Sequence, residues 1–212
     1  SREQRIFLIE DAAYRELHYD GPALPSLRSC DRSRQHVIYA QTFSKSFSPG
    51  LRVGCGILPE ELVGAVCDRK GNEDFGSASF GQHVLSEVFE RGLYQPHLAQ
   101  VQHAYRTKRN AMLSAAERHF SDLPGVTWVR PQGGLYVWMT LPESIATGFD
   151  SHLFRIAVRE EQVMYVPGEL CYSGHLADRK RNQMRLSYGV QDLAGIEEGI
   201  RRLANAVRRV LS

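Results

Sequence analysis

Residues 6–9 form a short apolar run, Ile-Phe-Leu-Ile, which Glu10 and Asp11 follow directly. Consecutive apolar residues over so few positions are typical of a strand that is buried on both faces, as in a parallel sheet. The same reasoning predicts further strands at residues 36–40 and 52–58 and helices at residues 59–66, 80–90 and 97–120. The expected fold class is therefore α/β, with helices packed around a partial sheet.

Beyond Pro124 and Gly125 the pattern changes to short strands with fewer helices between them. Strands are expected at residues 126–129, 135–139, 163–166 and 183–188, and helices at residues 151–161 and 192–211. Asp192 is expected to cap the last helix, because its carboxylate can accept a hydrogen bond from a free backbone N–H. This order predicts two domains: residues 1–122 carry part of an α/β sheet, and residues 123–212 form a small α+β domain.

The charge and composition exclude several classes of partner. The 26 Lys and Arg residues against 24 Asp and Glu residues give a formal net charge of +2, too small to predict binding to nucleic acid or an anionic membrane. Apolar runs are far shorter than the roughly 18 residues that span a bilayer. Four cysteines without the close pairs of zinc sites or disulfide scaffolds indicate reduced thiols in the cytoplasm, and the eight histidines show no metal spacing.

Lys45 is one of only four lysines in the chain and lies in a segment, residues 42–50, that is otherwise uncharged. Hydroxyl groups at residues 42, 44, 46 and 48, with the guanidinium of Arg52, can donate several hydrogen bonds to one phosphate group. No acidic residue lies between Asp31 and Glu60, so Lys45 has no ion-pair partner nearby in the sequence. Such a lysine is suited to lose its proton and attack a carbonyl as a Schiff-base nucleophile. An ordinary solvated loop lysine is the other interpretation.

Asp11 follows a predicted buried strand, and Lys45 follows the next strand along the chain. A carboxylate directly after a buried strand either caps a helix or turn or has a functional role as a charged group. The carboxyl ends of strands are where α/β sheets carry their chemistry. Asp11 and Lys45 are therefore candidates for one site.

Four motifs then stand in order along the chain: Asp11-x-x-Tyr14, Ser44-Lys45 followed by Pro49-Gly50-Leu51-Arg52-x-Gly54, residues 131–138 (Pro-Gln-Gly-Gly-Leu-Tyr-Val-Trp) and residues 184–188 (Met-Arg-Leu-Ser-Tyr). Together they resemble the class I and II aminotransferases, pyridoxal-phosphate enzymes of fold type I. The resemblance covers nearly the whole chain and is nearest to the branch that contains 2-aminoadipate and kynurenine aminotransferases and aminotransferase-like domains of bacterial transcription regulators. It implies that residues 1–122 are part of the cofactor-binding large domain and residues 123–212 are the small carboxyl-terminal domain.

The resemblance implies how the cofactor would be held. Lys45 would bind pyridoxal phosphate as a Schiff base and would move a proton between the substrate Cα and the cofactor. Asp11 would pair with the pyridine nitrogen and keep it protonated, and Tyr14 would donate to the ring oxygen. The phosphate would be held by three side chains, Thr42, Ser44 and Arg52. Thr42 departs slightly from the family, which more often has serine there, but it retains the hydroxyl.

The resemblance also assigns Arg185, which would clamp the substrate α-carboxylate with two hydrogen bonds. Taken alone, Arg185 in a chain this rich in arginine would more commonly be a surface ion-pair residue. Tyr136 and Trp138 share one side of a predicted strand by period-two alternation, and they are expected in the core rather than facing a substrate.

The implied function is transfer of an amino group from an amino acid to a 2-oxo acid by a homodimeric enzyme. Two alternatives stay open: a cofactor-binding effector domain of a transcription regulator, and a pyridoxal-phosphate-dependent lyase. Family members are longer than this chain, which is therefore expected to be a carboxyl-terminal portion. Its unpaired strand edges would favour pairing with another copy, and its own affinity for the cofactor would be weak.

Overall fold

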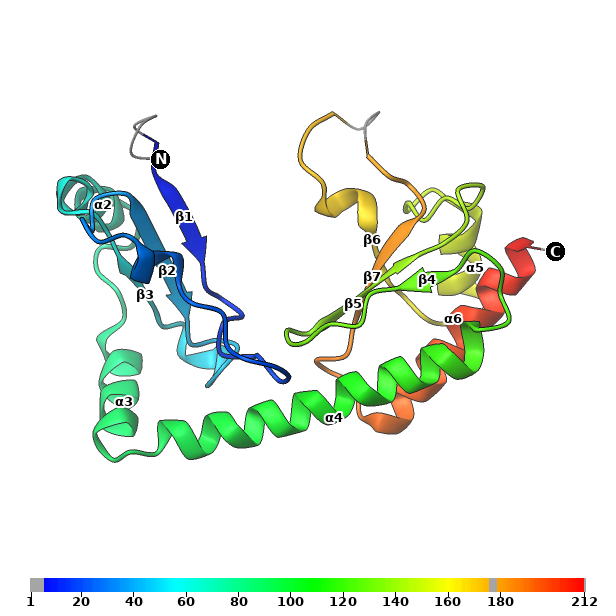
Figure 1. The fold of residues 1–212 in the computed structure, drawn as a ribbon, viewed down its shortest axis with the longest axis horizontal. Coiled ribbons are helices and arrows are strands. Elements are labelled where there is room, and N and C mark those ends of the chain that lie inside the picture. Colours follow the sequence, from blue (N-terminus) through cyan, green and yellow to red (C-terminus); the bar gives the residue numbers. More distant parts are fainter. Residues whose placement is uncertain (1–5, 176–178, 212) are drawn as a thin grey trace. The chain divides into compact units, whose positions relative to one another are not determined.

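The computed structural model describes residues 6–175 and 179–211 and divides the chain into two compact units, Ser1–Gln102 (unit 1) and His103–Ser212 (unit 2). Figure 1 labels the strands and the longer helices of both units and colours them along the sequence. Unit 1 contains β1 (Leu8–Asp11), α1 (Leu27–Cys30), β2 (Val37–Thr42), the 3-10 helix η1 (Pro49–Leu51), β3 (Gly54–Ile57), α2 (Glu60–Asp74), α3 (Ser79–Glu90) and the start of α4 (Tyr94–Phe120). Unit 2 contains the rest of α4, then β4 (Thr127–Trp128), β5 (Tyr136–Thr140), α5 (His152–Arg159), β6 (Val166–Pro167), the 3-10 helix η2 (Gly168–Cys171), β7 (Gln183–Ser187) and α6 (Leu193–Leu211).

The sheet of unit 1 has the strand order β1-β2-β3. Strands β1 and β2 are parallel, with Asp11 opposite Ala40, and β3 returns antiparallel to β2, with Gly54 opposite Thr42. A parallel pair needs a crossover between its strands, which here is the segment 12–36 with the short helix α1. The three predicted strands are present, and the predicted α/β class is confirmed.

Strand β1 is not buried on both faces, contrary to the sequence-based expectation. Leu8 is 40% exposed and Ile9 is 69% exposed. The reason is its position: among the described strands β1 pairs only with β2 and so lies at an edge of the sheet. An apolar edge strand of this kind presents both unpaired backbone groups and uncovered side chains.

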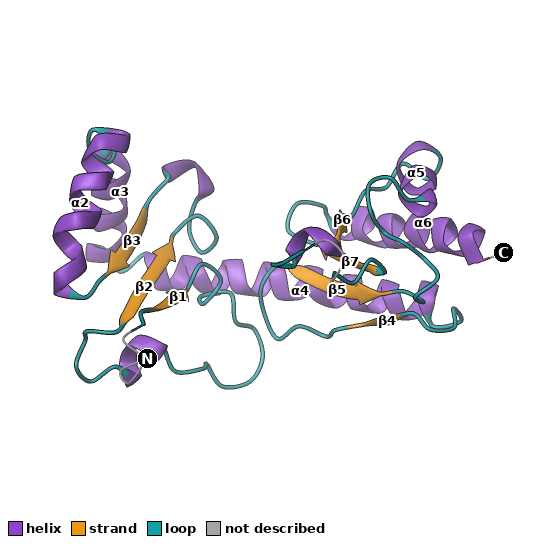
Figure 2. Ribbon diagram, turned by 90° about the horizontal axis from the view of Figure 1, so that it is seen from above, coloured by secondary structure: helices purple, strands orange, loops and turns teal. Residues whose placement is uncertain are grey.

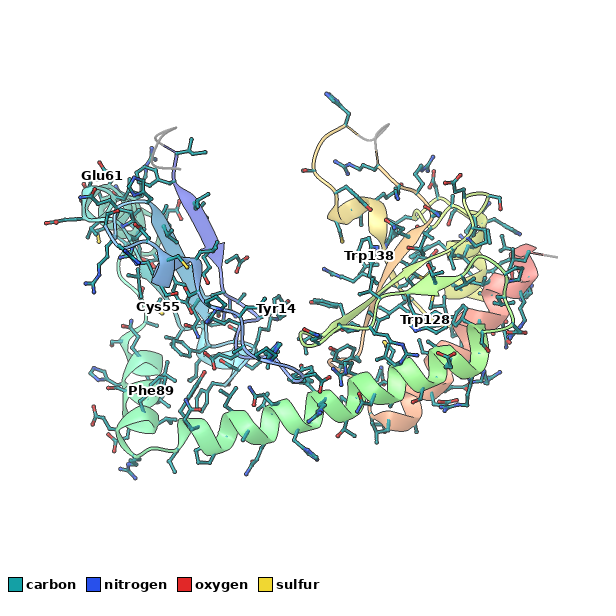
Figure 3. All side chains as sticks on the ribbon, in the orientation of Figure 1. Tyr14, Cys55, Glu61, Phe89, Trp128 and Trp138 are labelled. Carbon is teal, nitrogen blue, oxygen red and sulfur yellow. The ribbon has the colours of Figure 1, made fainter. Side chains whose placement is uncertain are left out.

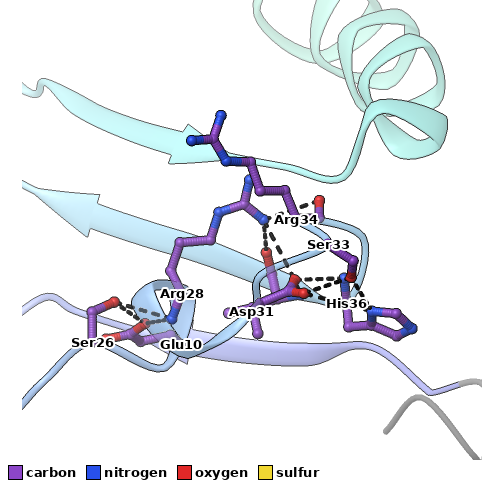
Figure 4. A network of polar contacts seen from close by, with 8 residues as sticks. Glu10, Ser26, Arg28, Asp31, Ser33, Arg34 and His36 are labelled. Atoms are coloured by element: carbon purple, nitrogen blue, oxygen red, sulfur yellow. Dashed lines mark hydrogen bonds and ion pairs between the residues drawn. The ribbon is translucent and has the colours of Figure 1, made fainter.

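Asp31 fixes the crossover to the start of β2 (Figure 4). Its carboxylate accepts hydrogen bonds from the backbone N–H groups of His36 at 2.8 Å and Val37 at 3.0 Å, and from the Ser33 hydroxyl. The N–H of His36 is the main reason that the pKa of Asp31 lies far below its ordinary value, since these donors stabilise the ionised form.

Glu10 fixes the other end of the same crossover to β1 (Figure 4). Its carboxylate accepts the Ser26 hydroxyl at 2.6 Å and the Arg28 N–H at 3.0 Å. Arg28 in turn donates to the carbonyls of Arg34 and Val37. Burial acts to raise the pKa of Glu10, but the hydrogen bonds outweigh it, and the pKa is lowered. Both strands are therefore held in register by the segment that connects them.

Helix α2 lacks the buried apolar face that its sequence suggests. Val63 and Val66 are each 42% exposed, and none of its described side chains is buried. Helix α3, by contrast, packs Leu85 and Val88 into a cluster with Phe43, Phe47 and Val53 from the loop after β2. The predicted Gly92 stop is present, since Gly92 has a φ of 66° just beyond α3.

Unit 2 is built on an antiparallel sheet with the order β4-β5-β7-β6 (Figure 2). Alternate residues of β5 and β7 form its core face: Val137, Met139, Met184 and Leu186, each at most 5% exposed. Helix α5 packs on α6, whose buried residues Ile196, Ile200 and Leu203 lie at helical spacing. Asp192 caps α6 as predicted, accepting the N–H of Gly195 at 2.7 Å. In the described part of the chain no helix is long and apolar enough to cross a membrane.

Strand β6 begins later than its sequence suggests. The predicted strand covered residues 163–166, whereas the pairing with β7 involves Val166 and Pro167. The N–H of Val163 still donates to Ala157 at the end of α5, and Gln162 before it has a φ of 52°. The chain is therefore still completing the helix end where the strand was expected.

We predict opposite effects of alanine at two helical glycines. A Cβ on Gly81 of α3 would lie 2.8 Å from the carbonyl oxygen of Leu51, so Gly81→Ala should destabilise the protein by about 1–3 kcal/mol. Gly64 of α2 has open space around it, so Gly64→Ala should stabilise by about 0.5–1 kcal/mol through helix propensity. Urea unfolding followed by far-UV circular dichroism measures both, and a loss of stability in Gly64→Ala as large as in Gly81→Ala would contradict the packing described for α3.

Candidate active site

The loop after β2 carries Lys45 and is held from beneath by buried side chains. Backbone N–H groups of Phe47 and Ser48 both donate to the carbonyl of Phe43, which closes a tight turn around residues 44–46. The rings of Phe43 and Phe47 pack against Tyr94 at centroid distances of 6.1 and 6.3 Å. Apolar residues on either side of Lys45 thus anchor the turn, while Lys45 itself is only half-buried.

Ser46 is buried and forms a hydrogen bond that the sequence did not reveal. The Tyr94 hydroxyl donates to Ser46 Oγ at 2.9 Å, and Ser46 is only 2% exposed. Burial raises the pKa of Tyr94, although the bond to Ser46 opposes the shift. By sequence the Ser46 hydroxyl is among the possible phosphate donors, whereas in the structure Ser46 is buried and its oxygen accepts the bond from Tyr94.

Thr42, Ser44 and Arg52 are brought together on the other side of the same turn. Thr42 Oγ1 lies 3.0 Å from Ser44 Oγ, and Arg52 Nη1 donates to Ser44 Oγ at 3.3 Å and to the carbonyl of Pro49 at 3.2 Å. The Ser44 N–H also donates to Thr42 Oγ1 at 3.2 Å. Two hydroxyls and a guanidinium therefore form one cluster of donors, called the donor cluster below.

Arg52 has a left-handed backbone conformation, with φ 54° and ψ 38°. A residue other than glycine in that region costs about 1 kcal/mol or more. This conformation ends η1 and turns the chain into β3. In the same conformation the Arg52 side chain donates hydrogen bonds to Ser44 and to the carbonyl of Pro49. No acidic side chain is paired with Arg52 among the described residues. A bound anion would supply the negative charge and the hydrogen-bond acceptors that would pair with this guanidinium.

Asp11 and Tyr14 lie at the carboxyl end of β1, at the same edge of the sheet as the loop that carries Lys45. The parallel pairing puts Asp11 opposite Ala40, just before the lysine loop begins. Asp11 Oδ1 accepts the N–H of Ala13 at 3.1 Å, and its side chain is exposed. Tyr14, labelled in Figure 3, is 37% exposed in the following turn. Gln102 of α4 steadies this turn by donating to the carbonyl of Glu16 at 2.7 Å.

Lys45 forms no hydrogen bond or ion pair with another described residue. Because no ion pair or hydrogen bond within the described residues holds this amine, it remains available to a bound ligand. In unit 1 the described structure thus gathers Thr42, Ser44 and Arg52 by direct contact and places Asp11, Tyr14 and Lys45 at one edge of the sheet.

Arg185 lies in unit 2, on the central strand β7, opposite Trp138 and Val166 in register. Its side chain is half-buried, its guanidinium carbon lies 4.3 Å from the centroid of the Tyr136 ring, and its Nε is buried without a hydrogen-bond partner in the described residues. It is therefore not the surface ion-pair residue of the alternative interpretation.

Tyr136 and Trp138 are not core residues, contrary to expectation. Both are half-buried on the face of the sheet that carries Arg185, whereas Val137 between them is fully buried on the opposite face. Trp138, labelled in Figure 3, makes an edge contact with the Tyr172 ring at 6.3 Å. The alternation was predicted correctly, but only the packing of the helices decided which face is the core.

The motifs at residues 131–138 and 184–188 are joined directly. The buried Tyr188 hydroxyl donates to the carbonyl of Gly134 at 2.7 Å, and the Tyr188 N–H donates to that of Leu135 at 3.1 Å. Gly134 has a φ of 78°, which turns the chain into β5 at low cost for glycine. Arg109 of α4 donates to the carbonyl of Pro131 at 2.9 Å. These bonds fix the strand that carries Tyr136 against the strand that carries Arg185.

Comparison with known proteins identifies a family and several relatives of similar sequence. The family model described as "Aminotransferase class I and II" matches residues 1–203. The 2-aminoadipate transaminase of Thermus thermophilus is 36% identical over 99% of this chain and 51% of its own length. A Bacillus subtilis protein described as an uncharacterized HTH-type transcriptional regulator, YisV, is 31% identical over 100% of this chain and 41% of its own. The chain thus spans about half the length of the curated relatives that it matches.

A solved structure of a relative shows the same fold. The crystal structure of the α-aminoadipate aminotransferase LysN from Thermus thermophilus, complexed with N-(5'-phosphopyridoxyl)-L-leucine, aligns with a TM-score of 0.88 at 36% identity. The alignment covers 99% of this chain and 52% of that one.

The Ser46–Tyr94 hydrogen bond should contribute measurably to stability. Tyr94→Phe would leave the buried Ser46 hydroxyl without a partner and should lower the free energy of unfolding by about 1–3 kcal/mol. Adding Ser46→Ala should recover much of that loss, since both partners are then apolar. Chemical denaturation of the single and double variants measures this, and strictly additive losses would show that the two hydroxyls do not interact.

Proposed function

This chain belongs to the class I and II aminotransferase family, and we propose that the protein transfers an amino group from an amino acid to a 2-oxo acid with pyridoxal phosphate as cofactor. The family match over residues 1–203 and the transaminase relatives support this activity. The observation that carries the proposal is the donor cluster beside Lys45, at the edge of the sheet where β1 ends in Asp11.

The donor cluster has the chemistry that a phosphate group requires. A phosphate dianion needs several N–H and O–H donors and a positive charge, and Thr42, Ser44 and Arg52 supply both within one turn. Arg52 is paired with no acid in the described residues, so a phosphate would not have to displace an ion-pair partner. The residues present therefore fit this part of the cofactor.

The remaining residues fit the rest of the cofactor. Lys45 would hold it through the side-chain amine, which has no other described partner. Asp11, an exposed carboxylate at the end of β1, would balance the charge of a protonated pyridine nitrogen. Tyr14 would donate its hydroxyl to the oxygen on the ring. When bound, pyridoxal phosphate supplies a conjugated ring that draws electrons from the bonds at the substrate Cα.

Two residues of this chain would act on the substrate. Lys45 would take the proton from the substrate Cα and deliver it to its new position, which general acid–base catalysis requires of a group with a free lone pair. Arg185 would hold the α-carboxylate with charge-assisted hydrogen bonds, for which its unpartnered, buried Nε is suited. Holding the carboxylate would fix which bond at Cα is oriented for cleavage, and so would favour loss of the Cα proton over decarboxylation.

We place the boundary between the large and small domains at residues 122 and 123. We further propose that the protein is a homodimer, because the apolar edge of β1 favours a covering partner. We also propose a cytoplasmic location, in keeping with four free cysteines.

An effector domain of a transcription regulator is the second candidate, because one relative at 31% identity bears such a description. In that case the same residues would bind cofactor and amino acid without turnover. Assays with a panel of amino acids and 2-oxo acids separate the two, since only an enzyme forms the new amino acid catalytically.

Lys45→Ala should abolish cofactor attachment and lower the rate of amino transfer by about 10²–10⁴-fold, because no group then moves the proton at Cα. Borohydride reduction followed by peptide mass spectrometry should find the phosphopyridoxyl group on Lys45 of the protein at its natural length. The matched control is Lys70→Ala, an exposed lysine paired with Asp74 on α2, which should change neither. Attachment to a different lysine would refute the assignment.

Arg185→Lys should raise KM for both the amino acid and the 2-oxo acid by about 10- to 100-fold, because lysine cannot form the two-pronged bond to a carboxylate. Arg155→Lys, at an exposed position on α5, is the control and should leave KM unchanged. Steady-state kinetics with each substrate varied in turn measures this; a rise for only one of the two substrates would argue against a shared carboxylate site.

A further inference from the structure

Arg185 and Tyr136 lie on adjacent strands and on the same face of the unit 2 sheet. In the β5–β7 ladder Tyr136 is opposite Ser187 and Trp138 is opposite Arg185, so Tyr136 and Arg185 are diagonal neighbours. The Arg185 guanidinium carbon lies 4.3 Å from the centroid of the Tyr136 ring. A cation at that distance from the ring face is attracted by the negative potential of the π system.

Gln183 lies two residues before Arg185 on the same face of β7 and is hydrogen-bonded to other residues. Gln183 donates to Thr140 Oγ1 at 3.1 Å and accepts the hydroxyl of Tyr172. Arg185 Nε is buried without a partner, and no acid is paired with Arg185 in the described residues. Within the described residues, the Arg185 guanidinium is therefore held by its cation–π contact with the Tyr136 ring.

An aromatic ring and an acid hold an arginine in different ways. An acid would occupy the N–H donors and would compete with any carboxylate that arrives, whereas a ring attracts the cation through its face and leaves those donors free. Burying a guanidinium nitrogen without a partner is costly unless a ligand satisfies it. The Arg185 guanidinium is therefore positioned by the ring while its N–H groups remain able to bind an anion.

We propose that Tyr136 is a positioning residue whose ring holds the Arg185 guanidinium in place to bind the carboxylate of the substrate. This inference rests on the proposed function for the role of Arg185 and adds Tyr136 to it. Tyr136 does not itself bind the carboxylate: the ring, not the hydroxyl, is the part that acts. Replacing the ring should therefore weaken carboxylate binding, and removing only the hydroxyl should not.

The test uses this chain labelled with ¹⁵N-arginine, with the Nε–Hε signal of Arg185 identified by its absence in Arg185→Lys. The wild type and Tyr136→Phe should show the signal displaced by the ring current, and Tyr136→Leu should show it near an ordinary arginine position. Titration with 4-methylpentanoate should give a dissociation constant about tenfold higher in Tyr136→Leu and within about twofold of wild type in Tyr136→Phe. The neutral 4-methylpentanamide is the control and should leave the signal unmoved.

The outcomes separate this inference from the proposed function. Equal affinity in wild type and Tyr136→Leu would overturn the role of Tyr136, while the amino-transfer assays of Lys45 variants would stand unaffected. A wild-type signal that does not respond to the carboxylate would also overturn it. Tyr136→Val, which retains strand propensity, replaces the leucine variant if the backbone amide spectrum shows that the latter is unfolded. At natural length, Tyr136→Leu should raise KM about tenfold with kcat unchanged, a split that general loss of structure would not produce.

Discussion

The parallel pairing of β1 with β2 is the constraint on which the candidate site depends. It sets Asp11 opposite Ala40, so the acid that ends one strand lies at the same edge as the loop that carries Lys45. The crossover is clamped at both ends, by Glu10 on β1 and by Asp31 at the start of β2. Because a slip of one residue would reverse the side-chain faces of β2, these clamps also determine which residues can reach the site.

The loop after β2 divides its side chains between two tasks. The buried Ser46 and the partly buried Phe43 and Phe47 contact Tyr94. Thr42 and Ser44 meet Arg52 on the polar side. The unfavourable backbone conformation of Arg52 is maintained by that same set of contacts. A packed support beneath and a cluster of N–H and O–H donors without an acidic partner above is the combination expected of a preorganised anion site. In unit 2 a candidate anion-binding arginine is positioned in a different way. The ring of Tyr136, rather than a hydrogen-bonded loop, holds Arg185, and its Nε has no hydrogen-bond partner in the described residues.

Some features of both units could be read from residue types and spacing alone. The alternation of strands and helices, the Asp192 cap and the absence of acids around Lys45 depend on local periodicity or composition, and local structure follows from them directly. The order of four motifs was enough to indicate the family, which the comparisons confirmed. The assignments of Asp11, Tyr14, Thr42, Ser44, Lys45, Arg52 and Arg185 to the cofactor and substrate stay predictions.

Burial, by contrast, was decided only by the tertiary structure. Ser46 and Ser44 are equivalent in sequence, yet one bonds to Tyr94 and the other to Arg52, because α4 packs beneath the turn. Periodicity paired Tyr136 with Trp138 but could not tell which face of the strand the helices would cover. The apolar run of β1 predicted burial, and its edge position left Ile9 69% exposed. A sequence specifies which side chains share a face, whereas whether that face is buried depends on segments far away in the chain that pack against it.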